Sequence, residues 1–146
     1  MLFRSALDSI RVRAAKILKQ DADAKKLRIN RARFPKPKMT GGDWDKAGKT
    51  VEEIVNREWK EYKQRALRVG IDTDWEERSM WATYGNSAVW EHFRFFCASV
   101  AVELGDGSCR VYDLTFRTMK TSDGWGNLKL WGVGGSYEIL KENLEK

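Results

Sequence analysis

The sequence has few of the residues that build metal and redox centres, with one histidine and two cysteines among its 146 residues. A lone histidine, His92, excludes a histidine-rich metal site, and no Cys and His spacing matches a zinc site. Cys97 lies five residues beyond His92, a separation that aligns two side chains on neither a strand nor a helix. We therefore expect His92 to have no partner, and the chain to have no catalytic residue, no metal site and no cofactor.

Long hydrophobic runs are also missing. The longest segment without charge, residues 79–90, is too short and too polar to cross a bilayer, so we expect no transmembrane segment. Hydrophobic residues still make up 42% of the chain and include seven tryptophans, which excludes overall disorder. The length predicts one domain that is large enough to bury a core.

Acidic residues are scarce at one end of the chain. Residues 1–38 contain twelve Lys or Arg against three Asp, whereas the other 108 residues contain fifteen Lys or Arg against eighteen Asp or Glu. The net charge of +6 therefore originates in the N-terminal segment. Such a segment suits an acidic partner: nucleic acid, anionic lipid or an acidic protein surface.

Residues 1–20 predict an amphipathic helix. Phe3, Leu7, Ile10, Ala14 and Ile17 recur at steps of three and four, which gives one apolar stripe beside several Arg and Lys. An Arg-rich, Ser-containing start with few acids is typical of a mitochondrial targeting segment and indicates the matrix side of mitochondria. A surface helix with a basic face, in another reducing intracellular compartment, is the alternative.

Residues 21–40 continue as a basic, extended arm, because Pro35 and Pro37 stop any helix. We divide the chain into this helix and arm, residues 1–40, and a single α+β domain, residues 41–146. The arm is either a polyanion-binding segment or a solvated connector. The candidate residues for binding a protein, RNA or anionic lipid are its basic side chains: Arg4, Arg11, Arg13, Lys16, Lys19, Lys25, Lys26, Arg28, Arg31, Arg33, Lys36 and Lys38.

Two helices are predicted next. The first covers residues 50–69, where Thr50 and Glu53 have the spacing of a capping box and Gly70 suits the position after the last turn. Nucleotide binding at Gly48-Lys49-Thr50 is disfavoured, since a phosphate-binding loop requires glycine where this chain has Asp43. The second helix covers residues 72–84 and ends at Gly85-Asn86. We interpret Asp72, Asp74, Glu76 and Glu77 as residues at the start of this helix, where the helix dipole favours negative charge. Metal binding or catalysis by these carboxylates is the less favoured alternative.

Residues 93–119 predict a β-hairpin, because apolar and polar residues alternate on both sides of residues 105–108. Asp106-Gly107 suits a type I′ turn. Residues 89–104 also fit a helical stripe, and we place helix or loop up to about residue 90 and strand from about residue 95. In this hairpin Cys97 faces Phe116 and Cys109 faces Leu104, so the two thiols are too far apart for a disulfide.

A third strand is predicted over residues 128–133, with a bulge or bend at Gly132, Gly134 and Gly135, and residues 137–140 add a last short strand or helical turn. The predicted fold is therefore α+β. It has an N-terminal basic arm with its helix, and two amphipathic helices packed on a three- or four-stranded antiparallel meander.

These features favour a non-catalytic accessory or scaffold subunit of a large mitochondrial complex of the respiratory-chain or ATP-synthase type. It would bind other protein subunits through the basic arm and through exposed aromatic residues, for which Phe34, Trp44 and Trp125 are the candidates. One alternative is an RNA-binding protein of the mitochondrial ribosome. Another is a small enzyme or ligand-binding domain with a pocket inside the curved sheet.

Overall fold

The computed structural model describes residues 2–145, with side chains from Arg4 onward. Phe3, which belongs to the predicted apolar stripe, lies outside the described side chains. The chain divides into two compact units, Met1–Ala32 and Arg33–Lys146.

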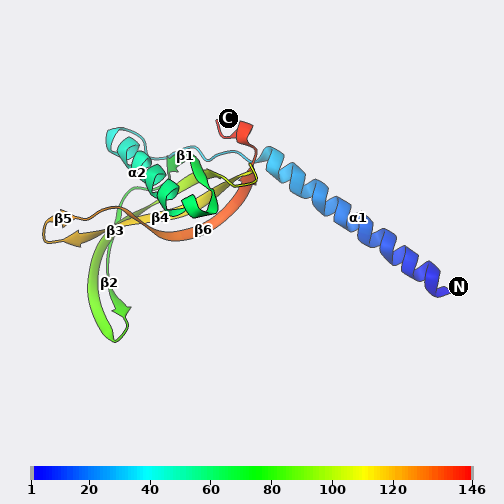
Figure 1. The fold of residues 1–146 in the computed structure, drawn as a ribbon, viewed down its shortest axis with the longest axis horizontal. Coiled ribbons are helices and arrows are strands. Elements are labelled where there is room, and N and C mark those ends of the chain that lie inside the picture. The colour runs from blue at the N-terminus through cyan, green and yellow to red at the C-terminus, as the bar shows by residue number, and fades with distance from the viewer. Residues whose placement is uncertain (1, 146) are drawn as a thin grey trace. The chain divides into compact units, whose positions relative to one another are not determined.

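The first unit is one long helix, α1 (Leu2–Arg31; Figure 1). Residues 21–31, predicted as part of an extended arm, continue this helix, because no proline or glycine interrupts the chain before Pro35. Its side chains are exposed from Arg4 to Arg28. The helix contains nine basic and three acidic residues. Within residues 2–145, no helix has the length and apolar character that crossing a membrane requires.

The second unit is built on an antiparallel sheet (Figure 1). Its six strands are β1 (Arg65–Ile71), β2 (Glu76–Tyr84), β3 (Ser87–Glu103), β4 (Cys109–Thr121), β5 (Gly124–Trp125) and β6 (Lys129–Ile139). The long β3 pairs with β2 along its first half and with β1 along its second half. Its other edge pairs with β4, which pairs in turn with β5 and β6.

The predicted fold is wrong in the number of helices and strands. Residues 76–84, predicted as a second helix, form β2, and residues 87–90, predicted as helix or loop, already belong to β3. Gly85 and Asn86 do not end a helix but form the two-residue turn between these strands. The apolar residues of this segment have helical spacing, yet nine cross-strand pairs with β3 outweigh that local pattern. One helix, not two, packs on a sheet of six strands.

The helix that packs on the sheet is α2 (Gly42–Glu58), which begins at Gly42 rather than at Thr50. Thr50 therefore lies inside the helix, where its hydroxyl donates to the Lys46 carbonyl at 3.1 Å, and the predicted capping box is wrong. The helix ends before the short 3-10 turn η1 (Lys60–Tyr62), and the predicted last turns belong to β1. Its buried face consists of Val51, Ile54 and Val55.

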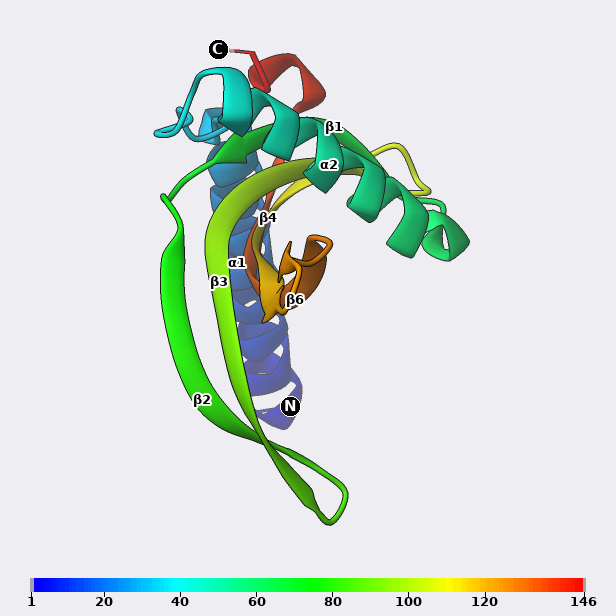
Figure 2. The same cartoon turned by 90° about the vertical axis from the view of Figure 1, so that its left-hand side faces the viewer.

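The main core lies between α2 and the face of the sheet that carries the even-numbered residues of β3 and β4. Its largest contributions come from Phe96, Val100, Leu114 and Phe116, all fully buried. Phe96 and Phe116 stack with their ring centroids 5.9 Å apart. Figure 2 shows α2 lying across this curved part of the sheet. Removing such large apolar side chains from water is the main stabilising contribution in this unit.

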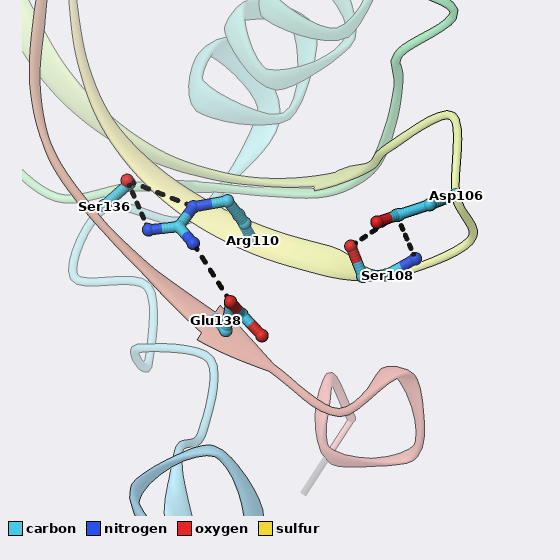
Figure 3. A network of polar contacts seen from close by, with 5 residues as sticks. All are labelled: Asp106, Ser108, Arg110, Ser136 and Glu138. Carbon is cyan, nitrogen blue, oxygen red and sulfur yellow. Dashed lines mark hydrogen bonds and ion pairs between the residues drawn. The ribbon is translucent and has the colours of Figure 1, made fainter. Parts of the chain in front are cut away.

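β6 is one continuous strand rather than the two short elements predicted. Its pairing with β4 shifts register between Tyr112 and Leu114 and again between Thr115 and Phe116, in the region where the glycines predicted a bulge or bend. Arg110 precedes the first shift on β4. Its guanidinium donates to the Ser136 hydroxyl at 3.0 and 3.3 Å and lies 3.5 Å from a Glu138 carboxylate oxygen (Figure 3). The strand leads into a terminal 3-10 turn, η2 (Lys141–Asn143).

Both strands of the predicted β3–β4 hairpin are present, one residue out of the predicted register. Cys97 pairs with Thr115 rather than Phe116, and Cys109 pairs with Glu103 rather than Leu104. Both cysteines are free, Cys97 half-buried and Cys109 buried.

The change of register comes from a longer turn than the type I′ turn predicted. Leu104 donates its N–H to the Ser108 carbonyl, and Gly107 donates to the Leu104 carbonyl. The Asp106 carboxylate accepts hydrogen bonds from the Ser108 N–H at 2.9 Å and the Ser108 hydroxyl at 2.6 Å (Figure 3). This side-chain contact stabilises a turn that begins at Leu104, so the strands pair one position earlier than predicted.

Candidate docking surface

The β2–β3 hairpin ends in a segment without charge, residues 79–90, which we call the hairpin tip. It carries five exposed large hydrophobic side chains: Met80, Trp81, Tyr84, Val89 and Trp90. Trp81 is 65% exposed and Trp90 is 56% exposed, although tryptophan is usually well buried. Exposed apolar side chains that gather in one place mark a contact with another molecule.

Both faces of the hairpin tip are apolar. Trp81 and Trp90 are cross-strand partners on one face, with ring centroids 5.3 Å apart and an edge-to-face arrangement. Met80 and Val89 lie on the opposite face, because side chains alternate along a strand. Figure 2 shows the tip projecting well beyond α2 and the rest of the sheet. A partner could therefore enclose the tip from both sides.

The outer edge of the hairpin is also open, since in the described chain β2 pairs with β3 alone. Backbone N–H and C=O groups along such an edge can pair with a strand of another protein. Glu76, Glu77 and Arg78 place charges on the first part of this edge. The tip has no such charges, so it is the part of the edge best suited to pairing.

A polar chain links Tyr84, beside the turn of the hairpin tip, to the rest of the sheet. The Tyr84 hydroxyl donates to the Glu91 carboxylate, and Glu91 lies 3.4 Å from the Arg117 guanidinium on β4. This hydrogen bond to the carboxylate raises the pKa of Tyr84 above its usual range. Glu91 is buried, and a buried carboxylate requires such partners. The tip is thus held in a defined orientation.

His92 is not isolated, contrary to expectation. Its ring nitrogens lie 3.2 Å from the Ser79 hydroxyl and 3.2 Å from a Glu77 carboxylate oxygen. These three residue types can serve nucleophilic catalysis, but all three side chains are exposed on the strand surface. Catalytic groups act in sites that exclude water, so we interpret this cluster as a surface contact between β2 and β3.

The acidic residues between positions 72 and 77 do not cap a helix. Asp72 accepts a hydrogen bond from the Ser99 hydroxyl at 2.6 Å, and Glu76 forms an ion pair with Arg78 at 2.9 Å. Across residues 2–145, no three His, Cys, Asp or Glu side chains come together in a way that could hold a metal ion.

The predicted polyanion-binding residues are divided between the two units. Nine lie on α1: Arg4, Arg11, Arg13, Lys16, Lys19, Lys25, Lys26, Arg28 and Arg31. Arg33, Lys36 and Lys38 belong to the extended segment at the start of the second unit. This segment is held on the sheet, because Met39 forms a bridge with Ile71 and the Tyr137 hydroxyl donates to the backbone carbonyl of Arg33 at 2.9 Å.

The three aromatic residues predicted to be exposed are absent from the exposed large hydrophobic side chains of residues 4–145. Phe34 is buried, Trp44 is half-buried against Trp75, and Trp125 is half-buried. Their polar, glycine-rich or proline-rich surroundings suggested exposure, but these rings pack against other side chains. The two most exposed tryptophans, Trp81 and Trp90, lie instead in the uncharged run of residues 79–90, which is visible in the sequence from its composition alone.

Comparison with known proteins gives no relative for this chain: no family model, no curated protein and no solved structure matches it. The arrangement of the hairpin tip itself therefore carries the functional argument. It combines a cross-strand tryptophan pair, a second apolar face and an open strand edge, and this combination suits binding to another macromolecule.

Proposed function

We propose that this chain is a non-catalytic accessory subunit of a larger protein assembly and that it docks through the hairpin tip. The observation that carries the proposal is the exposed Trp81–Trp90 pair on the projecting hairpin tip, which has no charged residue. Tryptophans that enter a partner's pocket dominate the affinity of many interfaces. A rigidly held hairpin also loses little conformational entropy on binding.

A protein suits the hairpin tip better than a lipid bilayer does. The outer edge of β2 exposes backbone groups that hydrogen-bond to water, and hydrocarbon would leave those groups without partners. A protein can supply a strand that pairs with the edge and pockets that accept Trp81 and Trp90. Both kinds of contact arise from the same short segment, so one partner can satisfy both.

Helix α1 supports a second contact with an acidic surface of the assembly. Leu7, Ile10 and Ile17 of its apolar stripe are exposed, and its charged residues sum to +6. A helix whose apolar stripe remains exposed gains most of its stability when a partner covers that stripe. The Arg-rich, acid-poor start of α1 also supports a place on the matrix side of mitochondria.

Fractionation by size of gently lysed source cells tests the proposal. The tagged wild-type chain should migrate with a large assembly, whereas the Trp81→Ala/Trp90→Ala chain should migrate at its own mass. Tyr62→Ala is the matched control, because Tyr62 is an exposed aromatic residue on η1, outside the hairpin. The proposal fails if the wild-type chain migrates alone, or if the double variant still migrates with the assembly.

A further inference from the structure

A cleft of about 590 Å³ opens on the α2 side of the sheet. It lies between the first half of α2, Trp75 just before β2, and residues 126–128 after β5. Arg94 and Phe96 of β3 and Thr118 of β4 contribute the sheet side of the cleft. All of these residues belong to the second unit, and the cleft does not include the hairpin tip.

Two polar groups at this cleft have no partner. Arg94 and Thr118 are cross-strand partners, so their side chains lie on the same face of the sheet. Thr118 is 5% exposed, and within the described chain neither its hydroxyl nor the buried Nε–H of Arg94 forms a hydrogen bond. Buried polar groups are normally satisfied, because an unsatisfied group destabilises the folded state. The Nε–H of Arg94 can only donate and the Thr118 hydroxyl can donate as well, so one acceptor group would satisfy both.

Aromatic rings, rather than a carboxylate, hold the charged end of Arg94. Its guanidinium carbon lies 4.0 Å from the ring centroid of Trp75 and 4.6 Å from that of Trp125. A cation–π contact of this kind supplies no hydrogen-bond acceptor in the plane of the guanidinium. The N–H donors of Arg94 therefore still require an acceptor oxygen.

We propose that this cleft binds a small monocarboxylate with an aromatic or branched apolar body. The planar carboxylate matches the guanidinium fork of Arg94 and supplies the acceptor that Thr118 lacks. Trp44 and Trp75, which pack on each other and on the buried Phe96, form an apolar wall for the rest of the ligand.

The charges at the cleft favour a single negative charge on the ligand. Asp43 and Lys46 on α2 have opposite charges, so Arg94 supplies the net positive charge of the lining. The N-terminal end of α2, which contributes Asp43 and Trp44, adds a partial positive charge from the helix dipole. A dianion such as phosphate would require a second uncompensated positive charge, and the charge of Lys46 is offset by Asp43.

Calorimetric titration of the full chain with phenylacetate, neutral phenylacetamide and inorganic phosphate tests this inference. We expect phenylacetate to bind with one-to-one stoichiometry and phenylacetamide to bind at least about tenfold more weakly, as the loss of a charge-assisted hydrogen bond implies. Phosphate should not bind measurably. The inference is overturned if phenylacetate does not bind at millimolar concentration, or if the amide binds equally well.

The variant Thr118→Val separates a ligand-binding role from a structural one. It retains the shape of the side chain and removes the hydroxyl, so binding of phenylacetate should weaken by about tenfold while thermal stability is maintained or raised. Arg94→Lys, which retains the charge but removes the fork, should weaken binding by at least as much. Thr40→Val, at an exposed threonine outside the cleft lining, is the control and should bind as the wild type does. Unchanged affinity in Thr118→Val would contradict the inference.

Discussion

Trp81 and Trp90 face each other across β2 and β3 with ring centroids 5.3 Å apart, and more than half of each side chain is exposed. Edge-to-face aromatic pairs normally stabilise a fold by burying the rings. Because this pair buries little apolar surface, it contributes little to the free energy of folding. Its exposed surface is available for contact with a partner.

Replacing this pair should leave the fold intact. We expect Trp81→Ala/Trp90→Ala to lower the free energy of unfolding by about 1 kcal/mol or less, the range for cross-strand aromatic pairs. Urea denaturation followed by circular dichroism measures this change. A loss of several kcal/mol would show that the pair is structural, and loss of docking could then no longer be assigned to a missing contact.

Phe96 lies on β3, as Trp90 does, and is the core residue with which the tryptophan pair is compared. It is fully buried and stacks with Phe116, whose ring centroid lies 5.9 Å away. Phe96→Ala should therefore lower the free energy of unfolding by about 3–5 kcal/mol, from lost burial and from the cavity that remains. The same urea denaturation measures it. A cost similar to that of the tryptophan pair would contradict the placement of the core between α2 and the sheet.

Asp72 makes a prediction about pH. Burial raises the pKa of this carboxyl above its ordinary value of 3.8, although the hydrogen bond from Ser99 acts in the opposite direction. The folded state therefore favours the protonated form, so the stabilisation from this group is present at acid pH and is lost as pH rises through the raised pKa. Asp72→Asn, which can still accept from Ser99, should stabilise the protein at neutral pH and lose that advantage below the ordinary pKa. Thermal unfolding across pH measures the difference, and an advantage that is independent of pH would contradict this assignment.

The two cysteines should differ in reactivity. Cys109 is buried, and burial raises the pKa of its thiol above 9.0, which keeps the reactive thiolate scarce. Cys97 is half-buried and pairs with Thr115, six positions from Cys109 along β4. We expect iodoacetamide to modify Cys97 first in the folded protein, with Cys109 modified only after denaturation. Mass spectrometry of digested samples gives the order, and faster modification of Cys109 would contradict the described burial.

The sequence predicts those elements that have one buried face. Apolar residues alternate in β3 and β4 between positions 96 and 116 because one face packs under α2, and this alternation is visible in the sequence. β2 has no such pattern, because Met80 and Trp81 are exposed on opposite faces. The acidic residues before it and Gly85-Asn86 after it fit the two ends of a helix as well as they fit a hairpin, and nothing local excludes the helix.

The start of α2 was missed for a different reason. Gly41 precedes the helix without any side-chain cap, so no capping pattern marks the true start, whereas Thr50 and Glu53 imitate one inside the helix. The carboxylate cleft could not be predicted either. Arg94 and Thr118 are cross-strand partners only in the observed register of β3 and β4. The sequence predicted a register that differs by one residue, which would not pair these two residues.

Site-specific photo-crosslinking from the hairpin tip tests the docking proposal most directly. A photoreactive amino acid replaces Trp81 in the full chain inside the source cell, and the matched control replaces exposed Tyr62 on η1. The account predicts a covalent adduct with one protein of the assembly from position 81 and no such adduct from position 62. No protein adduct from position 81, or the same adduct from both positions, would contradict docking through the hairpin tip.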